Sequence, residues 1–238
     1  MTFLTDKPVA ISGLQNRLAE FYKTQSTFGI IHRYLHKSLL WHRAGELMER
    51  IGISERVGIV PSWSWMAYHG DIRYRTSDLQ GLNWENIKLT TANDLRSDAQ
   101  NQCILTAPLG QILKSCRIQE LEDTNSKITN GEGHLVGWIR YDCENEDDVE
   151  RLGCIAIAQH KYPNHDWAVF GEDVDTWRKY ADVSWDEKLV QGDFHYVLLV
   201  KRVASEKEYI EEVYRRLGVA VIQSRHLSFE PALLARVV

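Results

Sequence analysis

The sequence lacks the cysteine motifs, the long apolar runs and the N-terminal signal that mark several large classes of protein. Its four cysteines lie far apart in 238 residues, so they form no CxxC zinc or redox motif and are too few for a disulfide scaffold. No stretch approaches the roughly 18 apolar residues of a membrane-spanning helix. The N-terminus lacks the basic and apolar segments of a secretory signal. We therefore expect a cytoplasmic protein with no membrane partner.

The charge balance argues against a nucleic-acid partner. The formal net charge is −5, and Lys and Arg form no basic stripe along the chain. The densest charge run is acidic, from Asp142 to Glu150, and lacks the glycine and the alternating ligands of a calcium-binding loop. We interpret this run as a solvated loop or edge.

Motifs for catalysis or cofactor binding are also missing. The chain has no Gly-x-Ser-x-Gly elbow, and its turn at residues 130–133, Asn-Gly-Glu-Gly, lacks the spacing of a phosphate loop. His32 and His36 stand four residues apart, which suits one metal ion, but no third ligand is near them in sequence. We expect no cofactor, no metal and no catalysis by this chain alone.

The first part of the chain has helical features. Asp6 is a candidate N-cap, and Pro8 can occupy the first turn without loss of a hydrogen bond. Apolar residues recur at near-helical spacing up to Phe21. A second helical stretch is expected from Gly29 to a stop at Gly52. Residues 1–55 are therefore predicted to be a helical segment.

Residues 56–238 are predicted to be a β-rich region. Residues 62–68 and 72–75 alternate in polarity around a turn at 69–71, which predicts a hairpin. Further strands are expected at 87–91, 103–107, 112–119, 134–141, 154–160, 193–203, 217–223 and 226–229. The predicted class is α+β, with N-terminal helices packed on a predominantly antiparallel, barrel-like β region in one compact unit.

Tryptophan is unusually abundant. The chain has eight, at positions 41, 63, 65, 84, 138, 167, 177 and 185. Each buries about 150–250 Å², so the set suits a hydrophobic core or a subunit contact. Tryptophan is also enriched in ligand clefts and exposed interfaces, and this alternative stays open.

Three segments, in order, carry a family resemblance. The first, residues 5–14, reads Thr-Asp-Lys-Pro-Val-Ala-Ile-Ser-Gly-Leu. The second runs from Gly29 to Leu39-Leu40-Trp41, with the spacing between Gly and Leu-Leu-Trp that the family has. The third, residues 61–65, reads Pro-Ser-Trp-Ser-Trp. The chain thereby resembles the region that follows the signature domain in fungal heterokaryon incompatibility (HET) proteins. Residues 196–200 and 216–220 are similar to the closing strands of that region. The chain departs from the family at Gly29-Ile30-Ile31, where a Gly-Leu-Trp is common.

The resemblance implies a regulatory or scaffolding role in fungal nonself recognition and programmed cell death, through protein contacts. The partner would be a preceding signature domain, which this chain lacks, or another chain. Without that domain, we expect an exposed apolar surface around Ile30, Ile31, Leu40 and Trp41, with self-association as its consequence.

Two other functions remain open. A barrel could bind a small planar ligand in a pocket lined by Trp63, Trp65 and Trp138. An enzyme could assemble a composite site that no sequence spacing discloses, for example a histidine brought beside a carboxylate.

Overall fold

A computed structural model describes residues 7–51, 60–74, 82–90, 103–121, 125–144, 152–160, 193–203 and 212–238. Strands dominate this part of the chain, and helices are few and short apart from the first. The predicted α+β class is therefore only partly correct, because the protein is mostly β. The proposed N-cap, Asp6, lies outside the described residues.

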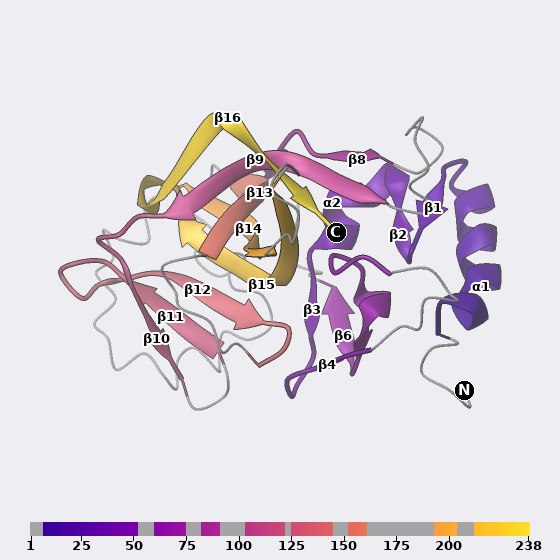
Figure 1. The fold of residues 1–238 in the computed structure, drawn as a ribbon, viewed down its shortest axis with the longest axis horizontal. Coiled ribbons are helices and arrows are strands. Elements are labelled where there is room, and N and C mark those ends of the chain that lie inside the picture. The colour runs from indigo at the N-terminus through magenta and orange to yellow at the C-terminus, as the bar shows by residue number, and fades with distance from the viewer. Residues whose placement is uncertain are drawn as a thin grey trace.

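The N-terminal part contains one long helix, α1 (Lys7–Phe21). After it come β1 (Ser26–Thr27), β2 (Ile30–Ile31), the 3₁₀ turn η2 (His32–Tyr34) and the five-residue helix α2 (Leu35–Leu39). The second helix, predicted from Gly29 to Gly52, is α-helical only at α2. The chain before α2 forms β2 and η2, and the chain after it forms β3 (Trp41–Arg43) and β4 (Glu49–Arg50). Figure 1 shows α1 at the outer edge of this part, away from the large sheet.

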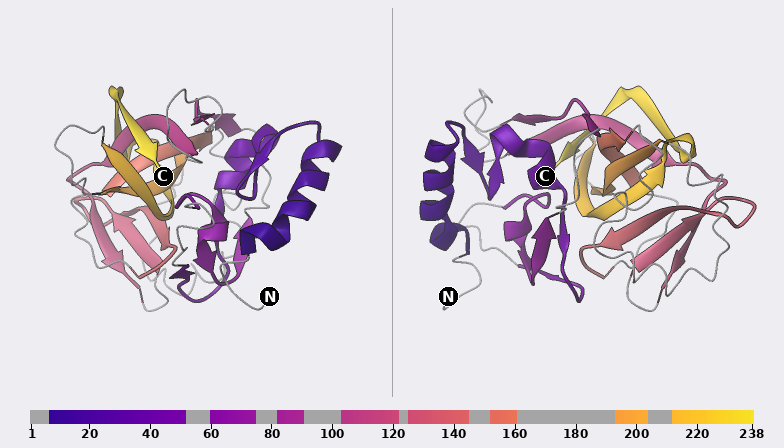
Figure 2. Two further views of the ribbon diagram at one scale, coloured as in Figure 1. Left: turned by 45° about the vertical axis from the view of Figure 1, so that its right-hand side comes forward. Right: turned by 180° about the vertical axis from the view of Figure 1, so that it is seen from behind.

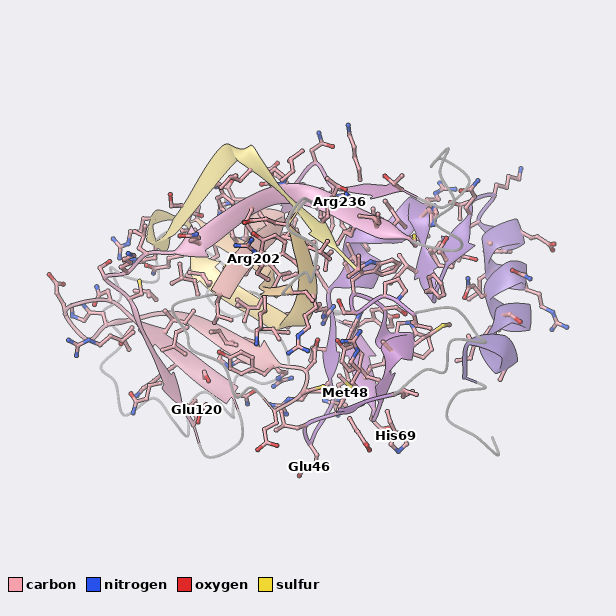
Figure 3. All side chains as sticks on the ribbon, in the orientation of Figure 1. Glu46, Met48, His69, Glu120, Arg202 and Arg236 are labelled. Atoms are coloured by element: carbon pink, nitrogen blue, oxygen red, sulfur yellow. The ribbon has the colours of Figure 1, made fainter. Side chains whose placement is uncertain are left out.

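The predicted hairpin at residues 62–75 is wrong both in its first strand, which is mostly turn, and in its pairing. Residues 65–67 form a 3₁₀ turn, η4 (Trp65–Ala67), followed by β5 (Tyr68–His69) and β6 (Ile72–Tyr74). β5 pairs with β4, and β6 pairs with β3, so the two strands never pair with each other. Met48 lies among these short strands, with Glu46 and His69 towards their outer end (Figure 3).

In the described part of the chain, the large sheet holds ten strands. Its main path runs β10 (Arg117–Glu120), β11 (Asn125–Thr129), β12 (Leu135–Tyr141), β15 (Val213–Gln223), β14 (Phe194–Val203), β13 (Leu152–His160), β9 (Ile104–Ile112) and β16 (Leu227–Val237). β7 (Leu82–Trp84) adds to β13, and β8 (Lys88–Thr90) adds to β9. Most predicted strands are confirmed with shifted ends, whereas β7 and β11 were not predicted.

The sheet curls strongly but is not the barrel that the sequence suggested. Its neighbours pair antiparallel, and a further parallel pairing joins β15 to β16 through Val213–Arg236 and Tyr214–Val237. Those two register pairs bring β16, at one end of the strand order, back to β15 within it, without making a closed barrel. Figure 2 shows the curl from two other sides, with the C-terminus beside the N-terminal part.

Both faces of the central strands are buried. Along β14, Tyr196, Leu198 and Val200 belong to the main core, while Val197 and Leu199 belong to a second apolar cluster on the opposite face. Side chains alternate across a strand, so a strand buried on both faces has a continuous apolar run. This is why residues 193–203 were recognisable as a strand. None of the described helices is long and apolar enough to cross a membrane.

Candidate functional site

The turn between β1 and β2 has an unusual backbone. Thr27 pairs with Ile30, so only Phe28 and Gly29 form the loop, with φ of 47° and 77°. Two positive φ values define the hairpin turn whose twist suits paired strands. A Cβ on Gly29 would lie 2.5 Å from Nε1 of Trp65, so close packing also requires glycine there.

The Pro-Ser-Trp-Ser-Trp block holds this turn in place. Ser64 Oγ donates a hydrogen bond of 2.6 Å to the Phe28 carbonyl, and accepts one of 3.0 Å from the Met66 amide. The Phe28 ring lies edge-on to Trp63, with ring centroids 6.3 Å apart. α1 contributes Gln15, whose Oε1 accepts from the Gly29 amide at 3.0 Å. Two of the three segments that carry the family resemblance are therefore in contact.

Ser62 ties the same block to the C-terminal strands. Its Oγ donates to the carbonyl of Val238 and accepts from the Arg216 amide at 2.9 Å. Its own carbonyl accepts from the Tyr68 hydroxyl at 3.0 Å. Because Ser62 is fully buried, each of these bonds satisfies a polar group that water cannot reach.

A buried ion pair stands next to Ser62. Arg216 and Asp142 side chains are 0% and 1% exposed, and two guanidinium nitrogens lie 2.8 and 3.2 Å from the two carboxylate oxygens. Arg216 also donates to the carbonyls of Leu39 and Trp41 and lies 3.5 Å from the Trp41 ring centroid. Our interpretation of the acidic run as solvated is therefore wrong at Asp142; residues 145–150 lie outside the described part.

Burial shifts the pKa of two groups in this region, the Asp142 carboxyl and the Tyr68 hydroxyl. Burial raises the pKa of Asp142 above its ordinary value, while the guanidinium groups of Arg216 and Arg43 oppose that rise. Burial, with a contribution from Asp142, also raises the pKa of the Tyr68 hydroxyl. Arg43 donates to the Tyr141 carbonyl at 2.8 Å. The arrangement joins β3, β12 and β15 and has a structural rather than a catalytic character.

The residues proposed as an exposed surface are mostly buried. Ile30 and Trp41 are 0% exposed and Leu40 is 5% exposed, whereas Ile31 is half-buried. That expectation is wrong because α2 and the 61–65 block cover these side chains from within the chain itself. Trp41 Nε1, for example, donates to the Trp63 carbonyl at 2.9 Å.

The tryptophans proposed for a ligand pocket pack in different places. Trp63 and Trp138 are buried in the main core, while half-buried Trp65 packs against the separate cluster around Trp41. The Arg140 guanidinium lies 4.9 Å from the Trp138 ring. These positions favour the interpretation of tryptophan as a core residue. Trp84 is 37% exposed, and Trp167, Trp177 and Trp185 lie outside the described residues.

An exposed apolar stripe lies on α1 instead. Leu14, Leu18 and Phe21 are 60%, 38% and 77% exposed, and their spacing of four and three residues puts them on one side of the helix. We call these three residues the α1 stripe. The sequence showed their helical periodicity but did not indicate that they are exposed. Ile11, which packs against the Trp41 cluster, and Gln15 face the rest of the protein.

The two candidate metal ligands are engaged separately. His32 Nε2 lies 2.8 Å from Thr27 Oγ1, and His36 Nε2 donates to the Glu85 carbonyl at 2.6 Å. Within the described residues, no group of three or more His, Cys, Asp or Glu side chains could hold a metal ion. The pair does not converge on one point.

The thiols are expected to be slow nucleophiles. Burial and the nearby Asp142 raise the pKa of Cys143 to about 11, and burial raises that of Cys154 to about 12. At pH 8 Cys143 should therefore react with iodoacetamide on the order of 100-fold more slowly than an ordinary thiol, because only the thiolate attacks. Mass spectrometry of timed samples measures this rate, with the urea-unfolded chain as control. Equal rates in the two states would contradict the expectation.

Comparison with known proteins adds no relative. No family model, no curated protein and no solved structure matches the chain.

Proposed function

We propose that this chain is a regulatory or scaffolding region of a HET-type fungal incompatibility protein and acts in the cytoplasm through protein contacts. The proposal rests on the ordered resemblance of three segments and on one structural observation, the α1 stripe. Its partner is a preceding signature domain or a second chain that covers α1.

Residues that carry the resemblance lie at one junction of the fold. The residues that it rests on most specifically, 61–65, bond to the β1–β2 turn, to Arg216 and to the last residue, Val238. A sequence block with that many internal partners is constrained by the fold. The block is therefore expected to recur in proteins that share this architecture, whatever they bind.

The α1 stripe carries the proposal of a protein contact. These three large apolar side chains are exposed and belong to none of the apolar clusters formed by the described residues. Contiguous exposed apolar residues mark interaction sites. A partner that covered them would gain roughly 1.5–3 kcal/mol per fully buried side chain before the costs of association.

Charge on the α1 stripe should abolish the contact. We expect Leu18→Glu and Phe21→Glu to weaken binding of a purified HET signature domain, or self-association, by at least about 10-fold, since a carboxylate resists burial in an apolar contact. Titration calorimetry measures the first process, and light scattering after gel filtration measures the second. Asn16→Glu is the matched control, because it adds the same charge to an exposed α1 position outside the stripe.

The outcome separates the proposal from a purely structural helix. Both stripe variants should melt within a few degrees of the native protein, since the replaced side chains are already exposed. A native chain that is monomeric and binds no signature domain would overturn the proposal. So would stripe variants that bind as well as Asn16→Glu.

A further inference from the structure

Three residues from distant parts of the sequence converge near the start of β14. His195 is the second residue of β14, Ser224 begins the 3₁₀ turn η8 (Ser224–His226), and Glu85 follows β7. Ser224 Oγ lies 2.8 Å from His195 Nδ1, and Glu85 Oε1 lies 3.9 Å from His195 Nε2. A histidine thus stands between a hydroxyl and a carboxylate, the three groups that hydrolases with a serine nucleophile combine, although the two ring nitrogens have exchanged partners relative to those enzymes.

Backbone contacts fix the two outer members of this group. The Ser224 amide donates to the Asp193 carbonyl at 2.8 Å, which holds η8 against the start of β14. The Glu85 amide donates to the Ile157 carbonyl at 3.0 Å, and the Glu85 carbonyl accepts from His36 at 2.6 Å. Positions held by strands and main-chain bonds suit a preorganised site.

We infer that Ser224, His195 and Glu85 form an acyl-transfer site in which Ser224 is the nucleophile, His195 the general base and Glu85 the positioning residue. The inference goes beyond the proposed function and does not rest on it. In the tautomer that this reaction needs, the ring proton is on Nε2, so Nδ1 accepts from the Ser224 hydroxyl and Nε2 faces the Glu85 carboxylate. The carboxylate then favours that tautomer and stabilises the imidazolium ion that forms during reaction.

The reaction is balanced without any cofactor. Ser224 Oγ attacks the carbonyl carbon of an ester while its proton passes to His195 Nδ1. The bond from that carbon to the alcohol oxygen breaks, and the departing oxygen takes the proton from His195. Water then attacks the acyl-serine by the same route, which releases a carboxylic acid and restores the serine. The gap between Glu85 and His195 must shorten on substrate binding, as ligand-free sites often require.

Burial keeps His195 in the form that a base needs. The histidine side chain is 12% exposed, and burial lowers its pKa, with the neighbouring Asp193 opposing the change. His195 is accordingly neutral at pH 7 and can accept a proton. Glu85 and Asp193 are the charged groups that face it.

The surroundings favour an ester with an apolar or aromatic group. The Phe229 ring lies 5.5 Å from the His195 ring, and the partly exposed Trp84 directly precedes Glu85. Glu85 is 39% exposed, so the group opens to solvent on that side. An aromatic ring against the base, with a partly exposed tryptophan next to Glu85 in sequence, suits a small aryl ester.

The test uses the full chain with p-nitrophenyl acetate and a fluorophosphonate probe. We expect a burst of p-nitrophenol and a label on Ser224, both absent in Ser224→Ala. His195→Gln should lower the rate at least about 100-fold, the scale of general-base catalysis. The native rate should rise with pH as His195 loses its proton, with a midpoint below about 6.5. Ser228→Ala, which removes an exposed hydroxyl of β16, should change nothing.

Several results would overturn the inference. A native chain no faster than Ser224→Ala, a label on another serine, or a His195→Gln variant with the native rate and pH profile each excludes the site. Circular dichroism of each variant shows whether it is folded. If Ser224→Ala fails to fold, Ser224→Cys provides the second measurement, since a thiol activated by His195 should become labelled by iodoacetamide while the same thiol with His195→Gln should not.

Discussion

Replacement of Asp142 by alanine is expected to lower the free energy of unfolding by about 3–5 kcal/mol. The change leaves the Arg216 guanidinium charged and buried without the carboxylate that it contacts through two nitrogens. Removal of one partner from a buried pair costs far more than the pair contributes, because the remaining charge has lost both water and its counter-ion. Urea unfolding followed by tryptophan fluorescence measures the loss.

An exposed pair of the same chemistry provides the control. Arg202 and Glu212 lie 2.9 Å apart, about as close as the buried pair, but their side chains are 65% and 48% exposed. Arg202→Met should therefore cost less than about 1 kcal/mol. The double variant Asp142→Leu/Arg216→Leu should lose less than the sum of its single variants, because no charge stays buried. Strictly additive losses, or equal losses for Asp142→Ala and Arg202→Met, would contradict this interpretation.

The composition around Asp142 does not reveal that this residue is buried and paired. In sequence it belongs to an acidic run, and such runs are usually solvated. Its partner stands 74 residues further along the chain, so no local pattern distinguishes it from its neighbours. The same limit applies to Ser224, His195 and Glu85, which share no spacing motif. Sites built from distant strands become visible only when the register of the sheet is known.

Strand pairing explains the other differences. The apolar runs at residues 154–160 and 193–203 identify strands because burial on both faces leaves few polar residues. Alternation at residues 62–68 and 72–75 predicted two strands, of which only the second and the end of the first are strands. Alternation also says nothing about which strand each one pairs with. The apolar spacing between Leu40 and Ile51 fitted a helix equally well. In the folded protein Trp41 lies in a strand instead, and its ring there contacts Arg216 and Tyr68.

Replacement of Gly218 by alanine is expected to cost about 3 kcal/mol or more, and it tests the join between β12 and β15. A Cβ at Gly218 would lie 2.2 Å from the Arg140 carbonyl oxygen and 2.9 Å from the Tyr141 Cα. Both are backbone atoms of the neighbouring strand, so no side chain can rotate away and the strands must separate. That separation would also pull Arg216 away from Asp142. Arg216 lies two residues before Gly218 on β15, and Asp142 directly follows β12.

Gly13 provides the matched control for this substitution. It lies exposed inside α1, and a Cβ added there would meet nothing within 4 Å, so Gly13→Ala should stabilise the protein by roughly 0.5–1 kcal/mol. The same added methyl group is thus expected to act in opposite directions at two positions, and thermal unfolding monitored by circular dichroism measures both. If Gly218→Ala were as stable as the native chain, β12 and β15 could not pair in this register. The polar contacts that link Ser62, Arg216 and Asp142 would then have to be assigned anew.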